Sequence, residues 1–152
     1  MIEFDTISTE TWRVRLPNDW SENNDSRNRI YFESADGSKG AYVSTWRFDD
    51  DPRSAAEILE SFRRVEVNSF SKMENHTWEA VDEWAASGAD LTIMGVDYLD
   101  RGHSYRIVCY LLASLPWVVR WSFHDYDCSD YDASKEFFGP IIDSATIHHE
   151  VA

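Results

Sequence analysis

The chain lacks the short motifs that mark most enzyme active sites. Its five histidines form no His-x-x-His or His-Glu-x-x-His spacing, and its two cysteines form no Cys-x-x-Cys pair. A Gly-x-Ser-x-Gly turn for a nucleophilic serine and a glycine-rich phosphate loop are absent as well. We therefore expect no cofactor and a protein that is not an enzyme, although a Ser/His/Asp set assembled by folding stays open.

Cysteine is scarce, and the two cysteines are not expected to form a disulfide. If Ala113 faces Trp117 across a tight turn, Cys109 lies opposite Trp121, and Cys128 falls far from it along the hairpin. That separation is larger than a disulfide spans. We expect Cys109 to be a buried apolar residue and neither thiol to act as a nucleophile.

Long apolar runs are missing too. Residues 1–10 lack the basic start and apolar stretch of a secretion signal, and no later run is long enough to span a bilayer. We therefore expect a cytoplasmic protein without a membrane partner.

Basic residues are few: 14 Lys and Arg stand against 28 Asp and Glu, for a formal net charge of −14. Such a chain repels phosphate backbones, so we expect no nucleic-acid partner. A basic protein partner is attracted by the same charge. Keeping the protein soluble is the simpler role of that charge.

The chain does contain many β-type segments, and aromatic residues make up 14% of it. Apolar and polar residues alternate in 12–16 until Pro17 ends the pattern, and residues 105–113 are apolar on both faces, as in a covered central strand. Residues 21–29 read as a loop, and 145–147 as a short edge strand. Longer strands are expected to begin at residue 30 and to occupy 41–48, 78–85, 91–99, 105–113 and 117–124.

Two segments have helical patterns. Ser54 and Glu57 have the spacing of a capping box, and apolar residues then mark one helix face to residue 69. The second helix is expected at residues 129–144, with a kink or a break at Gly139-Pro140. These elements predict one α+β domain over residues 1–152: a twisted, mostly antiparallel sheet of about six to seven strands with two helices packed on it.

The acidic segment 124–136 is the strongest candidate for metal chemistry. Four of its residues fall at positions 1, 3, 5 and 12 of a calcium-binding loop: Asp125, Asp127, Ser129 and Glu136. Position 6, where that loop needs glycine, is Asp130. Acids also suit the start of a helix, where they complement the helix dipole, and this is the simpler interpretation.

Two other features are candidate contacts for a protein partner. The run Asp49-Asp50-Asp51 is either a solvated loop before a helix or an electrostatic anchor for a basic partner. Segment 117–124 carries an aromatic ridge on one face, which Trp46 and Tyr42 are expected to extend. Most of these aromatic residues are expected in the core, but seven Trp exceed what two helices cover. The candidate contacts are Trp46, Asp49, Asp50, Asp51, Trp117 and Trp121.

The order of these elements resembles the PsbP-like fold. The resemblance rests on Trp-x-Val-x-Leu-Pro-x-x-Trp at residues 12–20, on the hairpin, capped helix and strands that follow, and on Ile-Ile-x-Ser at 141–144. The group includes DcrB-like lipoproteins, photosystem II extrinsic proteins, a Ran-binding import factor and the chaperones of type VI secretion effectors. The resemblance implies a scaffold that binds other proteins, and in the chaperones the sheet cradles apolar helices of the effector. It carries over no functional residue.

Two function hypotheses follow. The first is a non-enzymatic protein-binding domain, either a bacterial type VI secretion effector chaperone or a toxin immunity protein. Its partner is then a secreted effector or a basic toxin. Homodimer formation is left open. The chaperone needs an exposed apolar groove, and the immunity protein needs an acidic face with few exposed aromatic residues. The alternative is a hydrolase or metal-dependent enzyme that uses residues 124–136, in which His124 meets the acids of that segment in a concave pocket.

Overall fold

The computed structural model describes residues 2–24, 27 and 29–148. Two helices are α1 (Ala55–Ser71) and α2 (Tyr131–Ser144), and η1 (Arg101–His103) is a short 3-10 turn. The strands are β1 (Phe4–Ser8), β2 (Trp12–Pro17), β3 (Ser21–Glu22), β4 (Ile30–Glu33), β5 (Lys39–Arg47), β6 (Glu79–Ser87), β7 (Thr92–Asp100), β8 (Tyr105–Ser114), β9 (Trp117–Asp125) and β10 (Thr146–Ile147).

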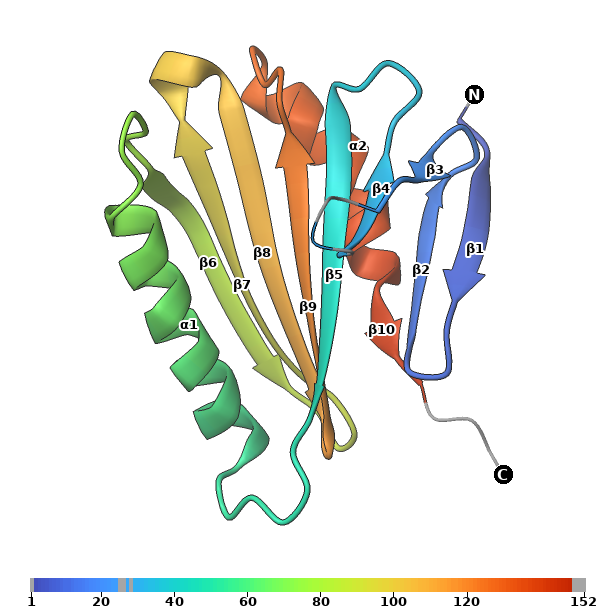
Figure 1. The fold of residues 1–152 in the computed structure, drawn as a ribbon, viewed down its shortest axis with the longest axis vertical. Coiled ribbons are helices and arrows are strands. Elements are labelled where there is room, and N and C mark those ends of the chain that lie inside the picture. Colours follow the sequence, from blue (N-terminus) through green and yellow to red (C-terminus); the bar gives the residue numbers. More distant parts are fainter. Residues whose placement is uncertain (1, 25–26, 28, 149–152) are drawn as a thin grey trace.

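The strands form two antiparallel sheets (Figure 1). The larger has the order β3-β4-β5-β9-β8-β7-β6, and the smaller has the order β1-β2-β10. The predicted α+β class, with a seven-stranded sheet and two helices, is confirmed. No helix among the described residues is both long and apolar enough to cross a membrane.

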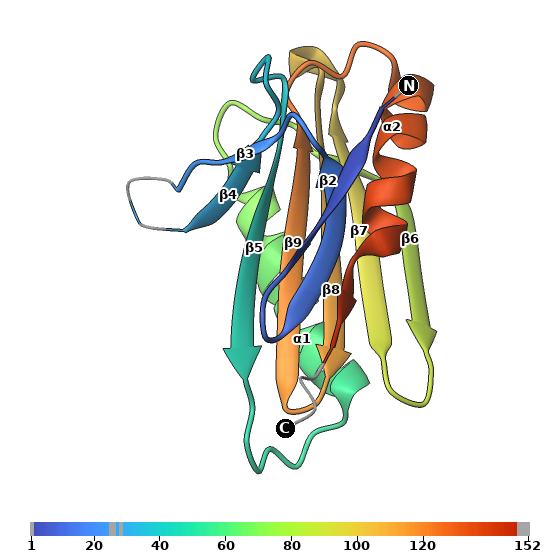
Figure 2. The ribbon, with the colours of Figure 1, turned by 90° about the vertical axis from the view of Figure 1, so that its right-hand side faces the viewer.

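One face of the large sheet is covered by α2 and the small sheet together (Figure 2). Side chains of β9 meet those of α2 and β2 there, and the most deeply buried include Trp121, Phe123, Phe138, Ile141 and Val14. Burying this much aromatic and aliphatic surface makes this layer the main core.

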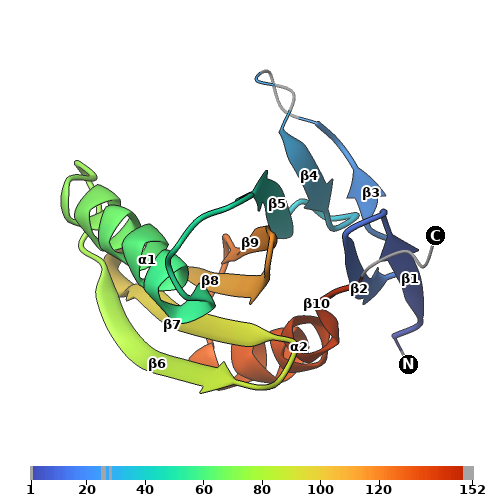
Figure 3. The same ribbon diagram turned by 90° about the horizontal axis from the view of Figure 1, so that it is seen from below.

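Helix α1 lies on the opposite face, inside the curve of the sheet (Figure 3). It packs on β7 and β8 through Ile58 and Leu59 at its start and Phe70 at its end. The predicted capping box is present: the amide of Glu57 donates to the Ser54 hydroxyl (3.1 Å), and the Ser54 amide donates to the Glu57 carboxylate (3.2 Å). Strand β8 is buried along nearly its whole length, as expected of a central strand covered on both faces.

Three local expectations need correction. The β8–β9 turn contains two residues rather than three, because Ser114 pairs with Trp117; Cys109 therefore lies opposite Ser122 and not Trp121. Helix α2 is one continuous helix across Pro140 and is not two pieces. The segment predicted as a loop at 21–29 begins with β3, and its residues 25, 26 and 28 lie outside the described chain.

Strand β1 was not expected at all. The expected strand β10 is present, and both cysteines are free and buried, as predicted. Strand β6, at the end of the strand order, pairs with β7 through a register shift between Ala80 and Asp82.

Candidate functional site

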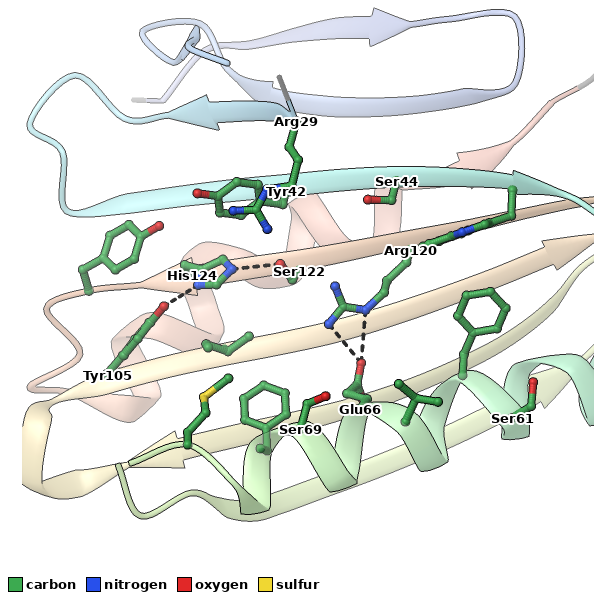
Figure 4. A pocket seen from close by; sticks show the side chains of 17 residues that line it. Arg29, Tyr42, Ser44, Ser61, Glu66, Ser69, Tyr105, Arg120, Ser122 and His124 are labelled. Carbon is green, nitrogen blue, oxygen red and sulfur yellow. Dashed lines mark hydrogen bonds and ion pairs between the residues drawn. The ribbon is translucent and has the colours of Figure 1, made fainter. Parts of the chain in front are cut away.

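A groove of about 910 Å³ lies between α1 and the part of the sheet formed by β5, β8 and β9 (Figure 4). Strand pairing explains which side chains enter it. Tyr42 pairs with Ser122 and Ser44 pairs with Arg120, and side chains of paired residues lie on the same face of a sheet. Every second residue of β5 and β9 therefore faces α1, and the intervening residues face the main core.

One end of the groove is apolar. Trp46 of β5 packs edge-to-face on Phe62 of α1, with ring centroids 4.8 Å apart, and Val65 lies one turn further along α1. Seven large apolar side chains are exposed in the described chain, and four of them line this groove: Trp46, Val65, Met73 and Tyr126. Exposed apolar surface that gathers at one concave site is typical of a binding surface.

The middle of the groove is bridged by an ion pair. The Arg120 guanidinium donates from Nε and Nη2 to Glu66 Oε1, both at 3.3 Å, and the Tyr98 hydroxyl donates to Oε2 of the same carboxylate at 3.3 Å. Arg120 also lies 3.4 Å from the Cys109 thiol, whose pKa burial raises. The contacts of Arg120 with Glu66 tie α1 to β9, and burial of Cys109 favours its protonated thiol over the reactive thiolate.

The other end is lined by tyrosines and His124. A hydrogen bond of 2.6 Å joins His124 Nδ1 to the Tyr105 hydroxyl, and one of 2.8 Å joins Nε2 to the Ser122 hydroxyl. Tyr42 packs edge-to-face on the imidazole, and the guanidinium of Arg29 lies 4.9 Å from the Tyr42 ring. This end presents aromatic faces and hydroxyl groups to an occupant.

The serine–histidine contact resembles part of a hydrolase site, but its electrostatics are unsuited to base catalysis. Burial, with the positive charges of Arg120 and Arg29, lowers the pKa of His124 to about 3. In a Ser/His/Asp triad a carboxylate on Nδ1 stabilises the imidazolium that forms. Here that partner is the phenol of Tyr105, whose own pKa is raised by burial. The low pKa therefore makes His124 a weak general base.

The enzyme hypothesis also needs His124 to meet the acids of segment 124–136. His124 points into the groove, whereas the neighbouring Asp125 points to the opposite face, where its carboxylate lies 3.9 Å from Lys39 Nζ. The Asp125 carboxylate also accepts a hydrogen bond from the amide of Asp127 (3.1 Å). Asp130, and not Asp127 or Ser129, caps α2 by accepting from the Ala133 amide.

The candidate calcium ligands are not gathered into a site. Glu136 is an exposed residue of α2, and Asp125 is buried at the end of β9. In the part of the chain that the structure describes, the one group of three His, Cys, Asp or Glu ligands that comes together is His76, Asp100 and His103.

The candidate partner contacts are divided by the sheet. Trp46 lines the groove. Trp117 is at the same end of the sheet but on the opposite face, where the Arg47 guanidinium lies 5.1 Å from its ring centroid. Trp121 is 0% exposed in the main core, so it is not available to a partner. Trp46 and Tyr42 do not extend the Trp121 ridge, because they lie on the other face of the sheet.

The Asp49-Asp50-Asp51 run lies in the connection from β5 to α1. Asp49 pairs with Arg47 (2.9 Å), and Asp51 pairs with Arg53 (2.8 Å). The Arg53 side chain and amide donate to Asp51 and lower the pKa of its carboxyl to about 2. Two of the three acids are therefore already partnered by neighbouring arginines.

Much of the groove was missed from the sequence. The polar residues Arg120, Ser122 and His124 alternate with apolar ones in a strongly β-type segment, and this pattern would have indicated a polar patch on one face. Glu66 of α1 points inward and is buried, which its residue type does not indicate. The Asp-x-x-His spacing of Asp100 and His103 is a further local signal in the sequence.

Comparisons with known proteins support the fold. No protein-family model matches the chain, and no curated protein sequence matches it significantly. The architecture is nevertheless that of the PsbP-like fold, an α+β sheet with helices on both faces. It is similar to cyanobacterial PsbP (CyanoP) from Synechocystis sp. PCC 6803, with a TM-score of 0.71, 11% identity and coverage of 97% of this chain and 94% of that one.

Two further solved structures are similar over nearly the whole chain. The Ran-binding protein Mog1p of Saccharomyces cerevisiae gives a TM-score of 0.59 at 9% identity, covering 98% of this chain and 97% of that chain. LpqN of Mycobacterium tuberculosis, described as involved in cell envelope biogenesis, gives 0.50 at 16% identity, covering 96% and 91%. At these identities the likeness shows a shared fold alone.

Proposed function

We propose that this protein is a non-enzymatic binding domain that holds an apolar helical segment of a partner protein in the groove between α1 and the sheet. The observation that carries the proposal is the gathering of four of the seven exposed large apolar side chains around that groove. Aromatic and aliphatic anchors around a concave site supply most of the affinity in helix-in-groove recognition. Mog1p, a protein of the same fold, is described as Ran-binding, which supports a protein-binding use of this scaffold.

The charge of the groove favours an apolar occupant over a basic one. Among the described residues, Glu66 is the one acidic residue that lines the groove, and Arg29 and Arg120 line it as well. A basic segment would therefore meet like charge there, whereas an apolar or weakly acidic segment would not.

The effector chaperone of a bacterial type VI secretion system is the form of this proposal that the groove supports best. A chaperone of this kind needs exposed apolar surface to shield an apolar segment of its effector before secretion. The toxin immunity form needs an acidic face with few exposed aromatic residues, and Trp46 and Tyr126 are exposed at the groove. We propose a cytoplasmic location for such a chaperone, because it binds its effector before export.

Two valines of α1 provide a matched test. Val65 is 68% exposed and lines the groove, whereas Val67 is 48% exposed and does not line it. Affinity-tagged wild-type protein, Val65→Glu and Val67→Glu would be used to recover partners from cells of the source organism, with quantification by mass spectrometry. We expect Val65→Glu to reduce recovery of the partner at least about tenfold, because a carboxylate would be buried against apolar surface. Val67→Glu should bind like the wild type.

Both substitutions are at exposed positions, so circular dichroism and thermal unfolding should show intact folds. Equal recovery with all three proteins, or equal loss with both variants, would remove the groove from the binding model. If the wild type and Val67→Glu recover the same protein and Val65→Glu does not, the experiment identifies both the partner and its binding site.

A further inference from the structure

Three potential metal ligands meet at the end of the sheet where α1 finishes and β7 turns into β8 (Figure 1). Asp100 is the last residue of β7, His103 lies in η1, and His76 lies in the connection from α1 to β6. Nδ1 of each histidine lies 2.8 Å from the same atom, Asp100 Oδ2. All three ligand atoms lie within 4.8 Å of one another.

The surrounding structure holds these side chains in place. Asp100 is 2% exposed, so its carboxylate is fixed at the base of the cluster. His76 stacks on Trp78 with ring centroids 5.3 Å apart. Ser104, directly after His103, has a left-handed backbone (φ 50°), and its carbonyl accepts a hydrogen bond from the amide of Cys128 (2.6 Å). Both imidazoles are thus directed at one oxygen atom by parts of the chain distant in sequence.

We propose that His76, Asp100 and His103 form a binding site for a divalent transition-metal ion of the zinc type. Two imidazole nitrogens and one carboxylate oxygen make a donor set that suits zinc, cobalt, nickel or copper, whereas magnesium and calcium require oxygen ligands. In the described part of the chain no other three such residues come this close together.

Both histidines would have to move to hold the ion. Ligand atoms about 2.0–2.1 Å from a tetrahedral zinc ion lie about 3.3 Å from one another. The two nitrogen–oxygen distances are 2.8 Å, so each histidine would move away from Asp100 by roughly 0.5 Å to admit the ion. The three ligand atoms lie within 4.8 Å of one another, so the two imidazole nitrogens would also approach each other by up to about 1.5 Å. Each imidazole then binds through Nδ1 and carries its proton on Nε2.

Three protein ligands leave a fourth coordination position. Asp100 and His103 also line a shallow depression of about 270 Å³, together with Thr77, Glu79 and Gly102. The fourth position faces water or a ligand from a binding partner, and it lies outside the groove proposed to hold a helix. The metal site therefore does not depend on the proposed function.

Calorimetric titration of the metal-free full chain with zinc chloride, in a buffer that does not bind zinc, tests the site. We expect one zinc ion per chain. His103→Ala and His76→Ala should each weaken binding at least about tenfold, because loss of even a supporting residue of a metal site costs that much. Glu79→Gln is the matched control: it removes a carboxylate from the same depression but no ligand, and it should bind zinc like the wild type.

A second measurement works on the wild-type protein alone. In nuclear magnetic resonance spectra, the imidazole nitrogens of His76 and His103 should shift in step with zinc up to one equivalent, with Nδ1 showing the larger change. The absence of stoichiometric binding, or binding that both histidine variants retain, would overturn the proposal. Zinc-dependent shifts at other histidines in place of these two would overturn it as well.

Discussion

Burial, together with the positive charges of Arg120 and Arg29, lowers the pKa of His124 and keeps its imidazole neutral. Asp100 is the opposite case. Burial acts to raise the pKa of its carboxyl, but hydrogen bonds from His76 and His103 outweigh this and lower it. His76 and His103 thus share a carboxylate partner, whereas His124 is hydrogen-bonded to two hydroxyl groups. This difference in partners distinguishes the proposed metal site from the groove.

The low pKa of His124 predicts a pH dependence of stability. The folded-state pKa is about 3 and the ordinary value is 6.5, so the unfolded chain binds more protons between these values. The free energy of unfolding should therefore fall as the pH drops below 6.5, by up to about 2 kcal/mol by pH 5 from this group. Urea unfolding from pH 7 to pH 5 should show the loss in the wild type and a flatter profile in His124→Gln.

The comparison with His124→Gln separates this effect from the general titration of an acidic protein. Identical pH profiles for the two proteins would contradict the prediction. So would a magnetic resonance titration in which His124 protonates near pH 6.5 in the folded state.

At the level of single residues, the sequence predicts which residues lie in strands but not which face of the sheet each side chain occupies. Trp46 and Trp121 are both tryptophans in β-type segments, and nothing local distinguishes them. Their faces are set by the pairing of Trp46 with Val118 and of Val43 with Trp121, two contacts between residues more than 70 positions apart. The burial of one and the exposure of the other follow from that long-range register.

Among the elements, β7, β8 and α2 are joined by one buried ion pair. Arg106 of β8 donates from Nε and Nη2 to the two carboxylate oxygens of Asp97 of β7, both at 2.9 Å, and from Nη1 to the Ser134 hydroxyl of α2 at 3.0 Å. The Tyr131 hydroxyl donates to the same carboxylate at 2.7 Å. Three N–H groups of this buried guanidinium thus link β8 to β7 and to α2.

Removing one partner of this pair should be costly. Arg106→Met leaves the Asp97 carboxylate buried without its cation, and we expect a loss of about 3–5 kcal/mol in the free energy of unfolding. The double variant Arg106→Met/Asp97→Leu leaves no uncompensated charge and should lose less than the single variant. Urea unfolding of the three proteins measures both values. A single variant as stable as the wild type would show that the pair does not hold α2 in place.

Elements with strong local signals were predicted well, and those without them were not. The Ser54–Glu57 capping box and the two-sided apolar pattern of β8 are local properties, and both predictions are confirmed. Helix α2 runs through Pro140 because Pro140 and Glu136 are both exposed, so the carbonyl that loses its amide partner lies on the solvent side. The one-residue error in the β8–β9 register has its origin in Ser114, a typical turn residue that instead joins the ladder.

Over the described part of the molecule, the acidic residues other than Glu66 lie outside the groove. The predicted partner-binding run Asp49-Asp50-Asp51 is at the sheet end that also carries Trp46 and Trp117, close to the apolar end of the groove. If the partner has a basic body beside the segment held in the groove, this run is placed to attract it.

Charge reversal tests this role of the acidic run. Replacing Asp49, Asp50 and Asp51 by Lys should slow association with the partner roughly tenfold at low salt, with a smaller effect at high salt. Replacing Glu79, Asp82 and Glu83 of β6 by Lys makes the same change in net charge far from that sheet end and serves as the control. Stopped-flow measurement of both variants is required. If the association rate of the Asp49-Asp50-Asp51 variant is unchanged, or if both variants associate equally slowly, the run has no specific role in binding.

The groove as a whole could not be predicted from the sequence. Its lining comes from α1, β5, β8 and β9, and these elements meet only because α1 packs on β7 and β8 and leaves the neighbouring strands open. Composition indicated surplus aromatic surface, and the resemblance indicated a binding scaffold. The position of the groove depends on tertiary packing that no local pattern encodes.

The register shift in β6 has a consequence for aggregation. A free sheet edge is a template on which another chain can add a strand, and β6 forms one edge of the large sheet. The bulge between Ala80 and Asp82 interrupts the regular spacing of its backbone groups, and three exposed acids, Glu79, Asp82 and Glu83, repel a second copy of the same edge. These features disfavour the addition of a second copy of the chain at the β6 edge.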